Sequence, residues 1–327
     1  MNILILSAGT RDKIVQFFKT ELRGEGRVIA TDCSNLAPAA YEADKFCLVP
    51  RINKPGYMDG ILDICREEKV DALLSLIDPE LSMVAEYADR FSKIGVTPII
   101  SPKHLVDMCF NKFEMASEFK KHGLKTALSY LSVDEFKKAR EEGKIDYPVF
   151  VKPVCGSASL NINKVSSDKE LEGLFSMYDD LMIQEYMDGQ EYGADVYIDM
   201  LSGKCTSVFI KKKIRMRAGE TDKSVSVHIP ELFDRIASFV EEEGFRGVID
   251  IDIFEVNGEY YFSEINPRFG GGYPHAYACN VNIPAQIINN LKGNKNPVTI
   301  GDYRDGMVMM KYNEIMIKDM EGTELVL

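Results

Sequence analysis

Several patterns that mark common protein classes are missing from this chain of 327 residues. The seven cysteines are scattered and never spaced Cys-x-x-Cys, which argues against a zinc site or a disulfide framework and indicates reduced thiols in a cytoplasm. The four histidines are equally scattered, so no imidazole metal centre is expected. No apolar run approaches the roughly 20 residues that span a bilayer, and residues 1–6 predict a strand rather than a signal peptide.

Positive charge is also scarce, because 39 Lys and Arg face 51 Asp and Glu and leave a net charge of -12. A phosphate backbone or an anionic membrane attracts a basic face, so neither nucleic acid nor a membrane is expected as a partner. A small anionic ligand held by a few local cations is compatible with this charge. What is present is a globular composition, 45% apolar and 28% charged, in a chain long enough for two or three compact units.

Residues 1 to about 101 alternate predicted strands with predicted helices, and one of these helices is expected over residues 80–91. Such βα units specify an open parallel sheet with helices on both faces, and ligands bind at the carboxyl ends of its strands. Residues 7–11, Asp32 and residues 78–80 fall at that edge. Asp32 would be the ribose partner of a dinucleotide, but the Gly-x-Gly-x-x-Gly pattern is absent around Gly9, so NAD binding is not favoured.

Beyond about residue 102 the strict alternation stops, and the spacing predicts the strand pairs and helices of α+β subdomains. One helix is expected to begin at Ser167, because Glu170 three residues on completes a capping box. Lys152 ends a predicted strand directly before a Gly/Ser turn that contains Gly156 and Ser157. Backbone N–H groups of such a turn can hold phosphate oxygens while the lysine adds a point charge. Lys112, at the start of a predicted helix, is a weaker candidate. The alternative for both lysines is a solvated position on the surface.

A second candidate for ligand binding lies between two predicted strands in residues 183–196. The first strand ends at Glu185, and the chain crosses a short linker through Gly189 before the next strand begins at Glu191. Free backbone amides near Met187 would meet an adenine edge, and Glu191 would accept hydrogen bonds from ribose hydroxyls. The alternative is a plain β-turn-β connection with two solvated glutamates.

The most informative segment is 250–268, which predicts a β-hairpin with Asn-Gly at its turn. Asp252 and Glu264 each lie six residues from Gly258, so they face each other, and Glu264 shares its face with Asn266. Two carboxylates and an amide oxygen are ligands for Mg²⁺. Arg268, two residues further on, adds a fork that suits phosphate. The alternative is an ordinary hairpin with polar residues on its solvated face.

A basic stripe is formed by Lys211, Lys213, Arg215 and Arg217, which recur at every second position of a predicted strand. This period places four cations on one face, which favours an anion, either a polyphosphate or a carboxylate substrate. A solvated edge strand guarded by lysines is the alternative. Residues 217–224 predict a mobile loop that could close over the site, with Glu220 as a candidate to receive a cationic substrate group.

Together these segments resemble the ATP-grasp superfamily, specifically the single-module proteins related to the large subunit of carbamoyl phosphate synthetase. The resemblance covers nearly the whole chain, and Glu264-Ile-Asn-Pro-Arg268 is its most specific part. It implies an α/β protein with a Rossmann-like pre-ATP-grasp domain over residues 1–101 and α+β grasp subdomains over 102–327. Residues 124–190 would form a small lid. One departure is the turn over 155–160, which has a single glycine where family loops are often richer in glycine and carry an arginine.

The resemblance also implies a role for each candidate residue. ATP would be bound by Lys112, Lys152, Gly156, Ser157, Glu185, Tyr186, Met187 and Glu191, and Mg²⁺ by Asp252, Glu264 and Asn266. Arg268 and Lys211 would act in catalysis, with Arg268 stabilising the transferred phosphoryl group. The substrates would be bound by Arg215, Arg217, Glu220 and Gly271.

We therefore expect a cytoplasmic ligase that uses ATP and Mg²⁺, or Mn²⁺ in its place, to join a carboxylate to an amine through an acyl phosphate, releasing ADP and phosphate. Phosphorylation of bicarbonate or carbamate is a lower-ranked alternative, because one module supplies one obvious site. A nucleotide-binding protein without turnover is a third, against which the intact metal ligands argue. The partners would be small molecules, and a homodimer is the default assembly. The carboxylate and the amine are not identified.

Overall fold

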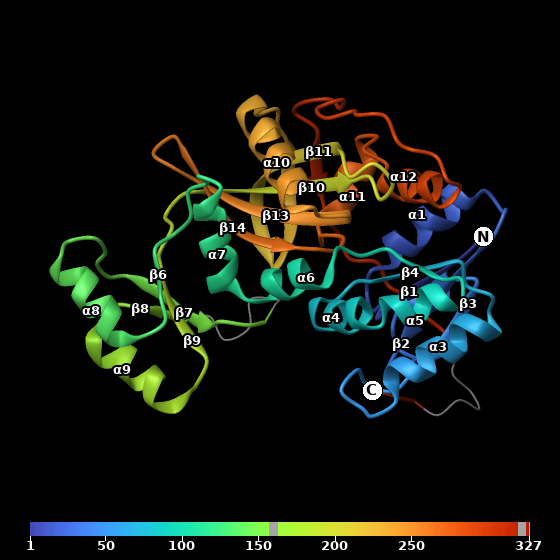
Figure 1. Ribbon diagram of the computed structural model, residues 1–327, viewed down its shortest axis with the longest axis horizontal. Coiled ribbons are helices and arrows are strands. Elements are labelled where there is room, and N and C mark those ends of the chain that lie inside the picture. The colour runs from blue at the N-terminus through green and yellow to red at the C-terminus, as the bar shows by residue number, and fades with distance from the viewer. Residues whose placement is uncertain (157–162, 320–324, 327) are drawn as a thin grey trace.

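The computed structural model describes residues 1–156, 163–319 and 325–326 and contains three β-sheets, each formed by consecutive strands (Figure 1). The N-terminal domain lies on the right in Figure 1, the smallest sheet and its two helices on the left, and the largest sheet between them. This arrangement confirms the predicted α/β fold, in which a Rossmann-like domain precedes α+β subdomains.

The N-terminal sheet has five parallel strands in the order β3-β2-β1-β4-β5. Ile3 and Ile5 pack on the side of α1, and Leu4 and Leu6 pack on the side of α3 to α5. The strand is apolar on both sides because helices cover both faces of a parallel sheet. The strands are β1 (Asn2–Leu6), β2 (Arg27–Asp32), β3 (Lys45–Leu48), β4 (Ala72–Ser75) and β5 (Thr97–Pro98).

The helices of this domain are α1 (Asp12–Leu22), α2 (Ala39–Glu42), α3 (Tyr57–Glu67), α4 (Asp78–Glu86) and α5 (Ala88–Lys93). The single helix predicted over residues 80–91 is wrong, because α4 and α5 replace it. Tyr87, with φ -91° and ψ 4°, ends the first of these helices and begins the second.

The largest sheet is antiparallel, with six strands in the order β14-β13-β10-β11-β12-β15. One face packs against α6 (Lys103–Phe110), α7 (Lys112–Lys121) and α10 (Pro230–Glu243). The other face shares an apolar core with α1, α11 (Tyr273–Ala278) and α12 (Ile283–Leu291), which joins this sheet to the N-terminal domain. The strands are β10 (Gln190–Ile198), β11 (Cys205–Arg217), β12 (Glu220–Ser226), β13 (Gly247–Val256), β14 (Glu259–Asn266) and β15 (Val308–Met310).

The smallest sheet has the order β6-β9-β7-β8 and packs against α8 (Val133–Glu141) and α9 (Asp168–Met177). Its strands are β6 (Ser129–Tyr130), β7 (Val149–Pro153), β8 (Asn163–Val165) and β9 (Leu181–Glu185). The Ser167 side chain caps α9 by accepting a hydrogen bond from the Glu170 N–H group, as its capping pattern predicts. This unit lies inside the range predicted for a lid, and its movement stays a prediction.

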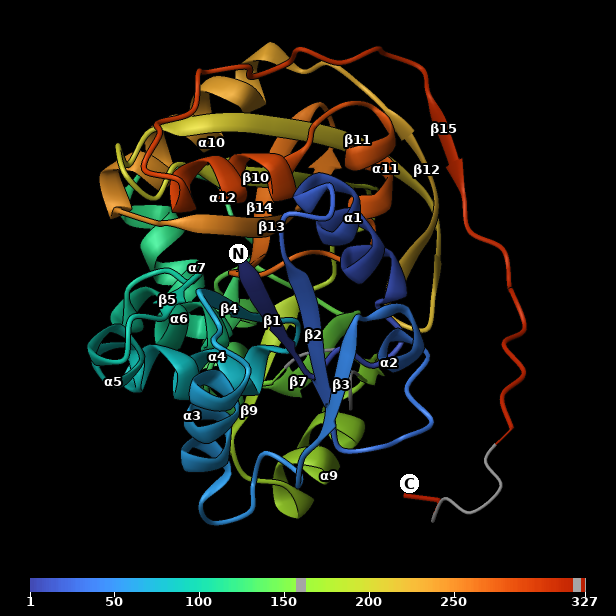
Figure 2. The same cartoon turned by 90° about the vertical axis from the view of Figure 1, so that its right-hand side faces the viewer.

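After β15 the chain runs along the outside of the molecule toward the N-terminal domain (Figure 2). There the Val326 N–H group donates to Asn35 Oδ1 at 2.9 Å. The longest helix in the described ranges is α10, with 14 residues, and no described helix has the length and apolar character of a membrane span.

Candidate active site

The three sheets meet around a cavity of about 500 Å³. The N-terminal domain contributes Arg11 and Asp78, which follow β1 and β4, and Lys152 comes from the end of β7. The predicted ligand edge of the parallel sheet therefore faces polar residues of the other two sheets. Further residues that line the cavity include Lys112, Gly156, Lys213, Glu220, Asp250, Asp252, Glu264, Asn266, Arg268 and Gly271.

The predicted hairpin is confirmed as β13 and β14, which turn at Asn257 and Gly258 with φ of 53° and 80°. Asp252 lies opposite Glu264 in the antiparallel ladder, and two positions away Asp250 lies opposite Asn266. Asp252, Glu264 and Asn266 therefore occupy neighbouring positions on two strands, and all three line the cavity.

The donor set of the hairpin fits a hard divalent cation. Burial raises the pKa of Glu264, and repulsion from Asp252 and Asp78 adds to this rise, although Lys112 and Lys152 oppose it. A bound cation would relieve the repulsion between these carboxylates. Oxygen atoms from two carboxylates and one amide also match the preference of Mg²⁺ for a few protein ligands alongside phosphate and water. The residues present therefore fit Mg²⁺.

Two buried lysines lie near the hairpin. Lys112 begins α7, and its ammonium group donates to the carbonyl oxygen of Gly156. Burial lowers the pKa of Lys152 to about 8, and repulsion from Lys112 contributes, while Glu264 and Asp252 act in the opposite direction. An anion bound between the two ammonium groups would counteract both the burial of Lys152 and its repulsion from Lys112. Ser157, which was predicted to bind the same phosphates, lies outside the described residues.

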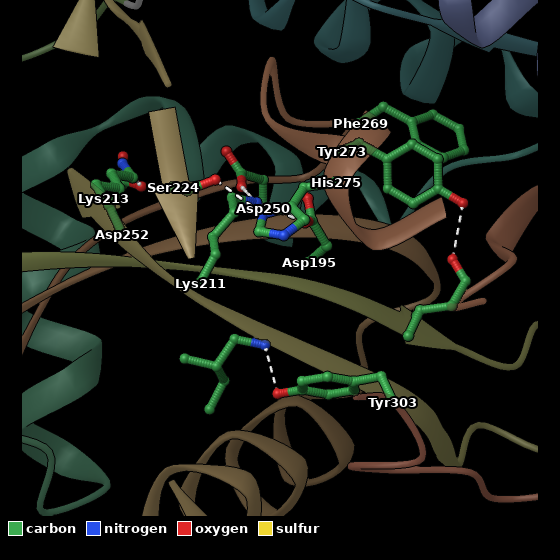
Figure 3. Close-up of polar contacts among 12 residues, drawn as sticks. Asp195, Lys211, Lys213, Ser224, Asp250, Asp252, Phe269, Tyr273, His275 and Tyr303 are labelled. Atoms are coloured by element: carbon green, nitrogen blue, oxygen red, sulfur yellow. Dashed lines mark hydrogen bonds and ion pairs between the residues drawn. The ribbon is translucent and has the colours of Figure 1, made fainter. Parts of the chain in front are cut away.

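Lys211 and Lys213 lie side by side on β11 but have different surroundings (Figure 3). Lys213 lines the cavity, and its Nζ lies 2.6 Å from Glu191 Oε1 and 2.5 Å from Asp252 Oδ1. Lys211 lies beneath the lining, with its Nζ 2.5 Å from Asp195 Oδ2 and 3.9 Å from Asp250 Oδ1. The catalytic role predicted for Lys211 stays a prediction, and its position indicates support of the site from behind.

The prediction that four cations share one face of β11 is wrong. The ladder between β11 and β12 shifts register after Lys213 and again after Arg215, which is the signature of a β-bulge. Met216 consequently joins Lys213 in the cavity lining, whereas Arg215 and Arg217 do not line the cavity. Their guanidinium groups lie 3.6 and 3.4 Å from the carboxylate of Asp222 instead.

The segment predicted as a mobile loop over residues 217–224 is mostly strand, because β12 begins at Glu220. Glu220 lines the cavity, where its Oε1 lies 2.8 Å from Arg11 Nη2 and its Oε2 lies 2.7 Å from Lys311 Nζ. Gly271 faces this carboxylate so closely that a Cβ atom there would lie 2.6 Å from Glu220 Cδ. A larger residue at this position would displace the Glu220 side chain, so the two residues lie in direct contact at the predicted substrate site.

Arg268 lies against the N-terminal domain. Its Nη2 is 3.0 Å from Asp78 Oδ2, and its Nη1 donates to the carbonyl oxygen of Phe269 at 3.2 Å. Burial alone would lower the pKa of Arg268, but the charges of Asp78 and Asp250 raise it above its ordinary value. The guanidinium group is therefore a permanent cation in the cavity wall.

The residues predicted to bind adenine lie at the connection between the smallest and the largest sheet. Glu185 ends β9, and its Oε2 accepts a hydrogen bond from the Leu128 N–H group at 3.0 Å. The Tyr186 ring has Lys164 Nζ 3.8 Å from its centre. Glu185, Tyr186, Met187 and Glu191 are absent from the described lining of the cavity. Glu191 is nevertheless linked to it, because Lys213 joins its carboxylate to Asp252.

Three charged residues of the cavity lining have no role predicted from the sequence, namely Arg11, Asp78 and Asp250. The first two lie in segments that the edge rule for parallel sheets already selected. Asp250 precedes Asp252 by two residues, so the strand period alone places both on one face. Burial raises the pKa of Asp250 to about 7, and repulsion from Asp252 and Asp195 contributes, against the attraction of Lys211.

Comparison with known proteins matches both parts of the chain. A family described as "ATP-grasp domain" matches residues 109–272, which is half of the chain, and one described as "PylC-like, N-terminal domain" matches residues 3–99. Phosphoribosylamine–glycine ligase of Fusobacterium nucleatum is 25% identical over 241 residues, 65% of this chain and 56% of that protein. The arginine-specific large chain of carbamoyl phosphate synthase of Bacillus subtilis is 20% identical over 227 residues, 66% of this chain and 22% of that protein.

A solved structure of similar fold is the biotin carboxylase domain of 2-oxoglutarate carboxylase from Hydrogenobacter thermophilus, in complex with MgADP, ADP and bicarbonate. It superposes with a TM-score of 0.75 at 17% identity and covers 94% of this chain and 73% of that one. The chain thus spans little more than half of the glycine ligase and less than a quarter of the synthase.

Proposed function

The chain belongs to the ATP-grasp family, and we propose that it is an ATP-dependent ligase that forms an amide from a carboxylate and an amine. The observation that carries the proposal is one cavity lined by the oxygen ligands of Asp252, Glu264 and Asn266 and by the cations of Lys152 and Arg268. This combination suits the transfer of a phosphoryl group, for which a protein supplies mainly positioning and charge stabilisation.

Within this proposal different residues bind the phosphates, the ribose and the adenine of the nucleotide. Lys112, Lys152 and Lys213 would bind the phosphates near Gly156 and Ser157. The adenine would contact Glu185, Tyr186 and the Met187 backbone, and Glu191 would accept from the ribose. Because the adenine residues are not in the described cavity lining, this half of the site would require the smallest sheet to close toward the largest one. Such closure excludes water from phosphoryl transfer.

Mg²⁺ held by Asp252, Glu264 and Asn266 would neutralise charge on the phosphate oxygens, and Mn²⁺ accepts the same oxygen donors. The protein's own groups do the rest. Arg268 would orient the substrate carboxylate and stabilise the negative charge that develops on the phosphoryl group. Lys211 would hold Asp195 of β10 and Asp250 of the hairpin in place from beneath the cavity lining.

The proposed reaction has two steps. A carboxylate oxygen attacks the γ-phosphorus of ATP, the bond to the leaving oxygen of ADP breaks, and an acyl phosphate forms. The amine nitrogen then attacks the acyl carbon, and the carbon–oxygen bond to the phosphate breaks. An ammonium substrate loses two protons during this step, one of which leaves with the phosphate and one of which goes to solvent.

The test uses a carboxylate labelled with ¹⁸O, with hydroxylamine as a general amine. We expect ADP, a hydroxamate and inorganic phosphate that carries one labelled oxygen, because the attacking oxygen leaves with the phosphoryl group. Glu264→Gln should abolish these products, whereas Glu259→Gln, an exposed position on the same strand, should not. Release of AMP and pyrophosphate in place of ADP would overturn the acyl phosphate mechanism, and ADP formation that depends on bicarbonate alone would favour the synthase-like alternative.

A further inference from the structure

A second group of metal-ligating side chains lies apart from the cavity, where the C-terminal ends of α7 and α10 meet. Glu118 lies in the last turn of α7, His122 follows four residues later on the same face, and Glu243 is the last residue of α10. Phe119 and Phe239 pack between the two helices, with ring centres 5.4 Å apart. The spacing of the histidines in the sequence does not predict this group, because His122 and Glu243 are 121 residues apart.

Three ligand atoms converge in this group. One ring nitrogen of His122 and one carboxylate oxygen each of Glu118 and Glu243 lie within 4.8 Å of one another. His122 Nε2 contacts Glu243 Oε1 and lies 3.8 Å from Glu118 Oε1. The side chains of Glu118, His122 and Glu243 are 18%, 21% and 15% exposed, so they are shielded from bulk water but open to an ion that enters from it. None of the three belongs to the described lining of the cavity.

The other ring nitrogen of His122 has a partner of its own. Nδ1 lies 3.2 Å from Glu242 Oε2, and an ionised carboxylate only accepts hydrogen bonds, so Nδ1 carries a proton and donates it. In a neutral ring Nε2 then presents its lone pair to Glu118 and Glu243. Metal-binding histidines characteristically donate their second ring N–H group to a carboxylate in this way. The ring also packs edge-on against Phe239, 5.1 Å between centres at 88°, which keeps Nε2 directed at the carboxylates.

The charges around Nε2 favour a cation. Lys121 Nζ lies 2.5 Å from Glu118 Oε2, so it pairs with the oxygen of that carboxylate that does not approach His122. Glu242 and Glu243 add two further negative charges. The C-terminal ends of α7 and α10, which carry the negative ends of the helix dipoles, lie at the same place. A proton on Nε2 would supply one positive charge there, whereas a divalent ion would supply two.

We propose that Glu118, His122 and Glu243 bind one divalent transition-metal ion, with Glu242 as the hydrogen-bond partner that orients the imidazole. One nitrogen and two oxygen donors suit Zn²⁺, which accepts His and Glu together with water, whereas Mg²⁺ favours oxygen donors alone. The ion would clamp the end of α7, a helix whose first residue, Lys112, lines the cavity, against α10. This site is separate from the Mg²⁺ ligands of the hairpin, and the proposal does not depend on the ligase function.

The test is a calorimetric titration of the metal-free chain with Zn²⁺ in excess Mg²⁺, in which we expect one Zn²⁺ to bind at this group. His122→Gln and Glu243→Gln should each abolish this binding. Glu242→Gln should weaken it about tenfold or more, the range for a residue that orients a metal ligand. His104→Gln, at an exposed position of α6, should bind Zn²⁺ normally. Glu264→Gln should also keep this binding, because Glu264 belongs to the hairpin.

Two further measurements separate this site from other binding. Co²⁺ in place of Zn²⁺ should give the visible absorption of nitrogen and oxygen ligands without a thiolate charge-transfer band, since the seven cysteines are the competing ligands. Saturating Zn²⁺ should raise the midpoint of thermal unfolding of the unmodified chain but not that of His122→Gln. The midpoints of both proteins without metal show whether the variant is folded, and Glu243→Gln gives the same comparison if it is not.

Zn²⁺ binding that survives both His122→Gln and Glu243→Gln, or a thiolate band with Co²⁺, would overturn the proposal. A lack of Zn²⁺ binding by the unmodified chain would overturn it as well. In that case His122 would be an imidazolium ion that is paired with Glu242 and Glu243.

Discussion

Lys211 and Lys213 place the same ammonium group at two positions of one strand, but the two groups have different surroundings. Both side chains lie over Gly193 of the neighbouring strand, where a Cβ atom would be 3.1 Å from the Cε atom of each. Lys211 and its partner Asp195 are each 1% exposed. The partners of Lys213, Glu191 and Asp252, are 25% and 26% exposed, and Asp252 lines the cavity.

The difference shows how burial changes what an ion pair contributes to the protein. A sealed pair has lost its hydration, so removing one partner leaves a charge that nothing compensates. A pair at the edge of a cavity can exchange its partners for water, a metal ion or a phosphate. We therefore expect Lys211 to matter first for stability and Lys213 to matter first for activity. Four experiments test this contrast.

The largest effect is expected for Lys211→Met, which should lower the free energy of unfolding by about 3–5 kcal/mol, because Asp195 then lacks its partner. Urea denaturation measures this loss. Lys212→Met, on the opposite face of the strand, should change the stability by less than about 0.5 kcal/mol. Adding Asp195→Leu to the first variant should recover part of the loss. A loss below about 1 kcal/mol would mean that the pair is not sealed.

Lys213→Met is expected to act mainly on turnover, lowering kcat/KM about 100- to 1,000-fold, the range for removing one group that stabilises charge in the transition state. Its effect on the unfolding free energy should be smaller than that of Lys211→Met, since water can reach Glu191 and Asp252. Steady-state kinetics and denaturation of the same two variants test the comparison. If Lys211→Met spared stability and Lys213→Met spared activity, the contrast would be refuted.

The partner of Lys213 gives the next prediction. Glu191→Ala should weaken ATP binding by about 1.5–3 kcal/mol, the range for hydrogen bonds to charged groups, because the variant loses the proposed ribose acceptor. Calorimetry with MgATP measures the affinity. Asp188→Ala, an exposed position in the preceding linker, is the matched control and should bind ATP normally. Equal affinity in both variants would remove Glu191 from the nucleotide site.

The smallest effect concerns pH. Burial and Lys112 lower the pKa of Lys152 to about 8, so its ammonium group deprotonates as the pH rises above this value. MgADP affinity should fall about fivefold between pH 8 and pH 9, and Lys152→Arg should flatten this dependence. The effect of pH on stability has the opposite sign. Between pH 8 and the ordinary pKa of a lysine, the unfolded chain binds more protons than the folded chain. The Lys152 contribution to stability therefore rises with pH, and a flat MgADP profile in the unmodified chain would argue against Lys152 as a phosphate ligand.

Much of the fold could be predicted because the sequence patterns that specify it are local. The alternation of β1 to β5 with helices, the Asn-Gly turn between β13 and β14 and the cap at Ser167 each depend on a few consecutive residues. The metal ligands belong to the same class, since Asp252, Glu264 and Asn266 come together through one hairpin. The single helix expected over residues 80–91 and the loop expected over 217–224 were wrong, because a break at Tyr87 and the pairing of β12 with β11 and β15 depend on tertiary packing.

The amino-acid sequence alone therefore specifies which chemical groups are present and which of them share a strand or a turn. The two-residue period of a strand places Lys211 and Lys213 on the same face, and the hairpin places Asp252 opposite Glu264. The packing of the whole chain is needed to see which lysine is sealed, that a bulge turns Arg215 and Arg217 away from the cavity, and that Asp78 contacts Arg268, 190 residues away. Burial and long-range pairing depend on where separate sheets meet, and no short stretch of the chain encodes that meeting point.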